Sequence, residues 1–423
     1  GNVSPYSYTS EMTVSTADDI VLGGSYPSYT SVGSTVPVSL TWEKSTTYDV
    51  GLDLDFFNNR LSVSGDYYRR YTTDMYTASV ALPAVYGTGS PKGNNAEMKT
   101  DGWELSLSWR DSFKLGGKPF DYSIKAMVWD SKSVITKYVN DTGSLGTVKG
   151  FIENGGSPSS YYVGMTVGEI WGYTVAGLFR DQADIDSSAI HDFVQASDKV
   201  TRPGQVKIAD LDGNGFIDPG NFAVDDHGDL RIIGNQSPRY RYGVNLSARW
   251  NGIGLSVFLQ GVGARDWYPG SDAGMFWGKY GRPFFALIPS IHNYTDDMYS
   301  AERNNWDTAY WPRMTTYQSN GTKNWTRLLE IPNTRYIQSA AYLRVKNIQL
   351  DYSFPKHICS AIRLQGLKIY VNAENLFTFT PLHKYAPNFD PEGLSYDSDF
   401  ASAADGYTYP ILKSVTVGVN ITF

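Results

Sequence analysis

The sequence predicts an all-β fold, a membrane-spanning antiparallel β-barrel with long loops, and three observations lead to this prediction. Apolar and polar residues alternate in about nine segments of roughly ten residues each, the length at which a tilted strand crosses a bilayer. Tyr, Trp and Phe together make up 14% of the chain, which suits the aromatic girdles of such barrels. Short connections alternate with long ones, as the turns and loops at the two ends of a barrel do.

Each strand is expected where the alternation with a period of two residues is strict. Leu52 and Leu54, for example, flank Asp53, so that one face of the strand is apolar and the other is charged. Near Lys346–Asn347 the alternation changes phase, which predicts a β-bulge. The expected strands are 48–56, 61–67, 103–109, 120–128, 240–250, 253–259, 343–354, 367–373 and 415–423.

The connections distinguish a barrel from a soluble β-sandwich, which also has alternating strands. A sandwich has no reason to sort its loops by length, whereas a membrane barrel has short turns at one end and long loops at the other. The short set is 57–60, 111–118, 250–252 and 355–365, and the long set is 72–96, 135–238, 262–340 and 381–409.

The expected strands do not form a closed barrel by themselves. An odd number of strands with edges at Ser45 and Phe423 cannot close in a single chain, and lipid does not tolerate an open sheet edge. We therefore expect further strands to precede this chain, and residues 1–40 to be the tail of another long loop. No secretory signal is visible after Gly1, so the front of an exported precursor is expected to be missing.

Composition narrows the possible partners. The net charge of −7 and the pI near 5.3 argue against nucleic acid. The single cysteine, Cys359, excludes an internal disulfide framework and a cysteine-based zinc site. The sequence has no apolar run of about 18 residues, the length that predicts a membrane-spanning helix.

Several short segments occur in an order typical of one family. The last segment, 415–423, alternates apolar residues and ends in Phe, similar to the segment by which outer-membrane barrels are taken up for assembly. The others are 40–44 (LTWEK), 50–53 (VGLD), 58–61 (NNRL), 66–68 (DYY), 306–313 (ending YWPR), 342–347 (YLRVKN), 374–380 (ENLFTFT) and 389–392 (FDPE). This ordered set, which covers most of the chain, resembles the SusC-like TonB-dependent outer-membrane transporters.

The resemblance implies an architecture of which this chain is a part. Such transporters have a plug domain and a barrel of about 22 strands, so residues 1–423 would be the C-terminal portion of one barrel domain. The plug, with its TonB-binding segment, and the first strands would be absent. The resemblance also implies an outer-membrane location in a Gram-negative, Bacteroidota-like bacterium, with outer-membrane lipid around the barrel.

The function implied by the resemblance is import. A nutrient, expected to be a glycan oligomer, would pass through the barrel with the help of a SusD-like surface lipoprotein and of TonB. The alternatives are import of peptides, a passive channel or adhesin barrel, and a soluble carbohydrate-binding or hydrolytic β protein. We expect no enzymatic activity, because carboxylate pairs such as Asp225–Asp226 lie in polar loops with nothing nearby to raise a pKa.

Residues 210–221 have the spacing of a calcium-binding loop. Position 12 is Asn221 instead of the usual Glu, and Asp225, Asp226 or Asp229 could replace it. The alternative is a turn rich in Asp and Gly that binds no metal. We expect a structural calcium ion that holds the surrounding loop in place. The expected ligands are Asp210, Asp212, Asn214, Phe216 (through its backbone carbonyl), Asp218 and Asn221.

Aromatic side chains in the connection 262–340 are candidates for substrate contact, because an aromatic face can stack on a sugar ring. The candidates are Trp267, Tyr268, Trp277 and Trp306. The alternative for each of them is packing within the loop or against the lipoprotein.

Overall fold

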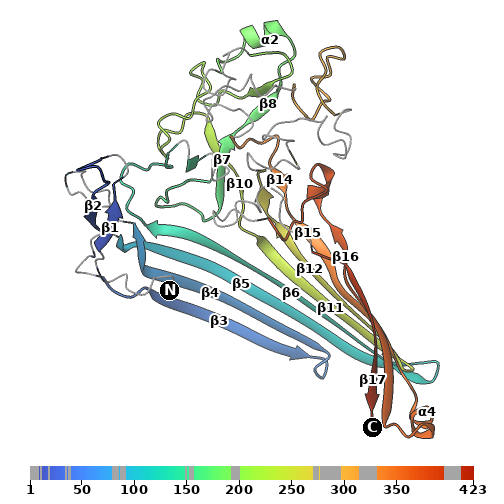
Figure 1. Cartoon of the computed structure of the whole chain (residues 1–423). Coiled ribbons are helices and arrows are strands. Elements are labelled where there is room, and N and C mark those ends of the chain that lie inside the picture. Colours follow the sequence, from blue (N-terminus) through green and yellow to red (C-terminus); the bar gives the residue numbers. More distant parts are fainter. Residues whose placement is uncertain are drawn as a thin grey trace.

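Nine strands form one antiparallel sheet in the computed structural model (Figure 1). The strands lie in the sheet in the order in which they occur in the chain, and each expected strand is confirmed. They are β3 (Lys44–Phe56), β4 (Leu61–Ala78), β5 (Lys92–Leu115), β6 (Lys118–Lys137), β11 (Arg239–Trp250), β12 (Ile253–Ala264), β15 (Tyr342–Ser353), β16 (Gly366–Phe379) and β17 (Ser414–Thr422). The structure describes residues 9, 12–17, 20–33, 36, 40–78, 85, 92–147, 150–151, 157–191, 201–269, 276, 297–313, 331–394 and 411–423.

The sheet is open within these described ranges. β3 and β17 each have one neighbour, and the other seven strands have two. This is the arrangement expected of part of a barrel, because a complete barrel has no sheet edge.

The two faces of the sheet differ in chemistry. Leu52 and Leu54 lie on the same face as their cross-strand partners in β4, and the pairing extends this apolar face across all nine strands. Its residues are strongly exposed, for example Val50 at 75% and Val417 at 74%. We call this the outer face and the opposite, polar one the inner face. An extended apolar face without a covering layer is what a membrane barrel presents to lipid.

The predicted β-bulge in β15 is confirmed. The pairing of β15 with both β12 and β16 shifts between Val345 and Asn347, so that Lys346 has no direct partner. Asn375 in β16 has a φ of 52°, which marks an irregularity in the facing strand. The extra residue lets Lys346 and Asn347 both point to the inner face, where Lys346 pairs with Glu392.

The connections are sorted by length as expected. The short ones contain tight turns, such as Gly116–Gly117 with φ of 58° and 78°, or the short helix α4 (Lys356–Ala361). The long ones gather at the opposite end of the sheet from α4 (Figure 1). They contain β7 (Glu169–Tyr173), β8 (Val175–Leu178), α2 (Gln182–Asp186), β9 (Val206–Ile208), β10 (Leu230–Asn235), β13 (Asp266–Trp267), β14 (Gln338–Ser339) and the 3-10 helix η4 (Pro381–Lys384). The segment expected to be the tail of another loop contains a hairpin, β1 (Met12–Thr16) with β2 (Ser28–Val32).

The hydrophobic core lies in the long connections and not in the sheet. Buried apolar side chains from three of these connections form one cluster, which we call the loop core. Its largest fully buried side chains are Trp267, Trp311, Tyr173, Tyr268, Tyr336, Phe151 and Phe276. Among the described residues, no helix is both long and apolar enough to cross a membrane.

Candidate functional site

The predicted calcium loop has an ordered, turn-rich backbone. Asp210 accepts hydrogen bonds from the backbone N–H groups of Gly213 (2.7 Å) and Gly215 (2.9 Å). Gly215 has a φ of +85°, a conformation that favours glycine and that allows the chain to fold back toward Asp210. Asp212 accepts a hydrogen bond from the backbone N–H of Asn214 at 3.0 Å, which closes the next turn.

Three carboxylates meet at this loop. Oxygen atoms of Asp210, Asp212 and Asp229 lie within 4.8 Å of one another. Asp229, one of the three proposed substitutes for position 12, is fully buried and accepts hydrogen bonds from the backbone of Leu211 (2.6 Å) and Asp218 (3.2 Å). The structure therefore brings Asp229 close to two of the expected ligands, Asp210 and Asp212.

The other expected ligands are arranged around this cluster in different ways. Asn214 donates a side-chain hydrogen bond to Asp218 at 3.3 Å and accepts one from the backbone N–H of Phe216 at 2.7 Å. The side chain of Asn221 donates to Asp226 instead of turning toward the three carboxylates. The side chains of Asp212, Asn214 and Phe216 are exposed, so this side of the loop faces solvent.

The electrostatics of the cluster favour a cation. Burial and the nearby charges of Asp212 and Asp210 raise the pKa of the Asp229 carboxyl above its ordinary value. Hydrogen bonds from the backbone of Gly215 and Gly213 lower the pKa of Asp210. A cation between these carboxylates would offset their mutual repulsion.

A buried histidine links the predicted calcium loop to the rest of the connection, and no sequence motif marks this residue. The ring of His191 lies 2.7 Å from the carbonyl of Ala189 through Nδ1 and 3.0 Å from the backbone N of Ile208 through Nε2. A carbonyl only accepts and an N–H only donates, so Nδ1 carries the proton and the ring is neutral. The adjacent Ile190 pairs with the calcium loop at Phe216.

The aromatic candidates for substrate contact are mostly internal. Trp267 and Tyr268 are both 0% exposed and belong to the loop core, where packing within the loop accounts for them. Trp306 is partly buried and packs against the same cluster. Trp277 lies outside the described residues. The hydroxyl of Tyr268 also accepts a hydrogen bond from the side chain of Asn333 at 3.0 Å, and this bond holds the Tyr268 ring in place.

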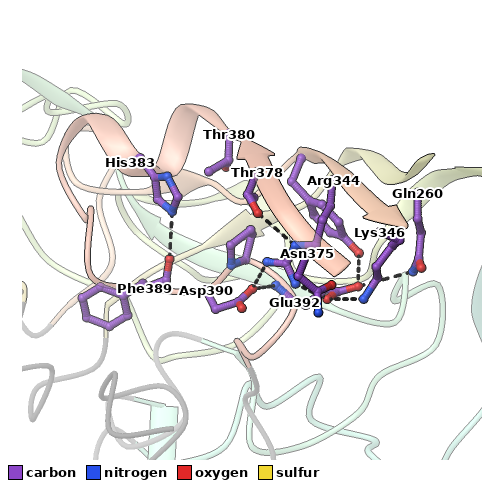
Figure 2. A network of polar contacts seen from close by, with 12 residues as sticks. Gln260, Arg344, Lys346, Asn375, Thr378, Thr380, His383, Phe389, Asp390 and Glu392 are labelled. Carbon is purple, nitrogen blue, oxygen red and sulfur yellow. Dashed lines mark hydrogen bonds and ion pairs between the residues drawn. The ribbon is translucent and has the colours of Figure 1, made fainter. Parts of the chain in front are cut away.

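A network of buried charges joins β15 to the connection after β16 (Figure 2). Arg344 is 3% exposed and forms ion pairs with Asp390 (2.6 Å) and with Glu392. Lys346 pairs with Glu392 at 2.9 Å, and the Arg344 Nε donates to the Thr378 hydroxyl at 2.9 Å. The network therefore attaches the segment 381–394 to the inner face of the sheet.

This network joins sequence segments that are far apart in the chain. Arg344 and Lys346 belong to the YLRVKN segment, Thr378 to the ENLFTFT segment, and Asp390 and Glu392 to the FDPE segment. Sequence reasoning identified each segment separately but did not bring them together. The feature of the sequence that could have pointed to this network is the presence of charged residues, Arg344 and Lys346, in a segment that otherwise has the alternation of a strand.

The inner face also has a polar groove near the short turns. Its lining includes Arg249, Asp351 and Lys368. The cationic groups of Arg249 and Lys368 each lie 3.3 Å from the Asp351 carboxylate. Arg60 and Asp111 on its other side pair at 3.4 Å. Charged and hydroxyl side chains thus line the inner face, as they do in the lumen of a membrane barrel.

Comparison with known proteins places these features in context. Residues 4–225 match the profile of a family described as TonB dependent receptor-like, beta-barrel. The chain is 26% identical over 393 residues to TonB-dependent receptor P3 of Formosa agariphila, covering 91% of this chain and 34% of that protein. It is 24% identical over 391 residues to TonB-dependent receptor SusC of Bacteroides thetaiotaomicron, covering 91% and 32%. The chain thus spans about a third of the length of these curated relatives.

Solved structures show the same fold. The RagAB peptide transporter superposes with a TM-score of 0.65 at 18% identity, covering 99% of this chain and 39% of that chain. The RagAB peptide importer in its 'open-open' state gives a TM-score of 0.66, also at 18% identity, covering 100% and 38%.

Proposed function

Because this chain belongs to the TonB-dependent receptor-like β-barrel family, we propose that the protein containing it imports a nutrient across the outer membrane of a Gram-negative bacterium. The observation that carries the proposal is the nine-stranded sheet with an apolar outer face, a polar inner face and all long connections at one end. The family is one of receptors and transporters, and not of enzymes.

In this proposal the sheet forms the C-terminal part of the barrel and the long connections face the cell exterior. The inner face with its paired charges borders the path of the substrate. TonB supplies the work through a plug domain that lies outside this chain.

A lipoprotein of the SusD type is the proposed partner at the extracellular end. The support is the sequence likeness to SusC together with the fold of RagAB. The test is mass spectrometry of the intact complex, purified in detergent from the native outer membrane. Recovery of a plug-containing barrel and a surface lipoprotein is the expected result. Recovery of the chain in the soluble fraction would point to the soluble carbohydrate-binding alternative instead.

The substrate class is proposed to be a glycan oligomer, with peptides, the cargo of the RagAB transporter, as the alternative. The inward packing of Trp267 and Tyr268 means that sugar stacking would have to use other side chains. The test is uptake of labelled glycan oligomers and peptides by cells with and without the gene. Import that stops when an uncoupler removes the proton gradient is expected, whereas a passive channel would continue to conduct.

We also propose that Asp210, Asp212 and Asp229 hold a calcium ion with a structural role. Support comes from the close approach of three carboxylates, one of them fully buried, on a loop with calcium-loop spacing. The ion would neutralise this cluster and hold the loop against Leu211 and Asp218, to which Asp229 is already hydrogen-bonded.

The calcium proposal is tested by protein unfolding in excess calcium and in chelator. Binding at about 100 times Kd would stabilise the loop by roughly 2.7 kcal/mol. The variant Asp229→Asn should lose this stabilisation, whereas Asp141→Asn, an exposed aspartate in the same connection, should keep it. Equal behaviour of the two variants would exclude a site at Asp229.

A further inference from the structure

The outer face of β4, β5 and β6 changes from apolar to charged before these strands reach the long connections. The three strands contain 18, 24 and 20 residues, whereas roughly 9–11 residues suffice to cross a bilayer. Their upper parts therefore extend beyond the hydrocarbon layer. Outer-face positions in that region lie at the level of lipid headgroups or above it.

An aromatic row marks the boundary between the two zones. Tyr48, Tyr67 and Trp103 lie on the outer face; the pairing places Tyr67 directly opposite Trp103, and Tyr48 one step further along, directly opposite Arg69. Aromatic residues of this kind are enriched at membrane–water interfaces. In β4 the next outer-face residue toward the long connection is Arg69, which pairs with Asp101 in β5.

Three cations gather around one carboxylate just beyond this row. Arg69 lies 2.5 Å from Asp101, and Lys99 lies 3.4 Å from the same carboxylate. Lys132 in β6 is the direct cross-strand partner of Asp101 and is exposed. We call these four residues the headgroup patch. With three positive charges and one negative charge, the patch has a net charge of +2.

The patch keeps its positive charge because nearby acidic groups are already paired. Asp130, the cross-strand partner of Trp103, binds Arg239 through both of its oxygens. Glu97 pairs with Lys137 at 3.3 Å. In the described part of the chain Lys132 has no ion-pair partner, and the Arg69 side chain remains 42% exposed.

We propose that the headgroup patch binds the phosphate groups of phosphorylated lipid headgroups in the extracellular leaflet. The inference rests on the proposed outer-membrane location and goes beyond it, because it names a lipid site on this chain. Arg69 and Lys99 offer several N–H donors side by side, and Lys132 adds a mobile charge. The aromatic row below them would contact the sugar and acyl parts of the same lipid.

The experiment uses the full transporter in detergent and measures affinity for micellar lipid A with and without its phosphates. The variant pair is Lys99→Gln with Lys132→Gln, which leaves the Arg69–Asp101 pair intact. The matched control is Lys114→Gln with Lys118→Gln, two exposed lysines of the same strands at the opposite end of the sheet. At about fivefold per lysine near an anionic surface, the first pair should weaken binding about 25-fold.

A second variant is expected to gain affinity, a result that a misfolded protein would not give. Asp101→Asn removes the carboxylate of the patch and should tighten binding of phosphorylated lipid A. Equal loss in the matched control, equal binding of dephosphorylated lipid A, or displacement by inorganic phosphate at the same concentration would each overturn the lipid site. Cell fractionation and substrate uptake are measured in parallel. Normal location and uptake with failed lipid binding would reject only this inference and leave the proposed function standing.

Discussion

At the scale of single residues, His191 is the side chain whose protonation has the clearest structural consequence. Burial lowers the pKa of His191 in the folded protein, whereas a histidine in the unfolded chain has a pKa of about 6.5. As the pH falls below that value, the unfolded form binds a proton that the folded form does not, so the stability of the folded form decreases. Protonation would also remove the acceptor for the backbone N–H of Ile208.

We therefore expect acid to loosen the connection around β9. The measurement is hydrogen–deuterium exchange of a peptide containing Ile208, corrected for the intrinsic rate. In the unchanged protein, exchange should be faster at pH 5.5 than at pH 7.5. In the variant His191→Gln this difference between the two pH values should be smaller. His357→Gln, an exposed histidine in α4, serves as the control and should behave like the unchanged protein. A pH effect of equal size in His191→Gln would assign it to other groups.

Arg344 is the second residue with a specific consequence. It is buried among two carboxylates and a hydroxyl, so Arg344→Met should remove the ion-pair partner of Asp390 and leave Glu392 with Lys346 alone. Removal of one member of a buried ion pair costs about 3–5 kcal/mol. The segment 381–394 should detach more often, and limited proteolysis within it should be faster.

Arg249→Met is the matched control for that prediction. Arg249 is half exposed, and its partner Asp351 keeps Lys368 at 3.3 Å when the arginine is lost. The expected cost is therefore below about 1 kcal/mol. Equally fast proteolysis of both variants would show that the buried network does not hold the segment.

At the scale of the strand, glycines opposite tyrosines form a repeated pairing, on the inner face at Gly102 and Gly418 and on the outer face at Gly261. Gly102, Gly261 and Gly418 are the direct partners of tyrosines in the adjacent strands. A Cβ added at Gly102 would lie 2.3 Å from Cζ of Tyr68, so the ring covers the position where a side chain would stand.

Gly102→Ala should therefore displace the Tyr68 ring and destabilise the barrel by about 1–3 kcal/mol, the usual cost of overpacking. Gly65→Ala is the control, since a Cβ there would meet Leu105 at 3.8 Å, an ordinary contact. Refolding into lipid vesicles, followed by denaturant titration, would measure both. A larger loss in Gly65→Ala than in Gly102→Ala contradicts the pairing argument.

The strands were predictable from the sequence, and the contacts of the loops were not. Alternation with a period of two depends only on which face of a strand meets lipid, so it identified nine strands and the bulge near Lys346. The long connections have no such period. Their packing depends on contacts between distant segments, such as Arg344 with Glu392, that spacing along the chain does not encode. The proposed calcium loop could be predicted because its candidate ligands are close together in the sequence, except for Asp229.

At the scale of the whole molecule, two parts are stabilised by different solvents. The outer face of the sheet is apolar and needs lipid or detergent, whereas the loop core buries its apolar side chains against itself in water. We expect two thermal transitions in detergent. The loop transition, followed by tryptophan fluorescence, should shift with acid and chelator. The sheet transition, followed by mobility in SDS gels, should shift with detergent chain length. A single transition that responds to both treatments would contradict this division.

The sorting of the connections by length also affects which parts of the chain can change during evolution. Insertions and deletions in the long connections change the surface at one end without altering the pairing of any strand, because strand pairs such as β3 and β4 are joined at the other end by short turns or by α4. Gene variants can therefore differ in the length and sequence of these connections while the order and pairing of the strands stay the same. Relatives that share about a quarter of their residues with this chain are the kind of lineage such a division allows.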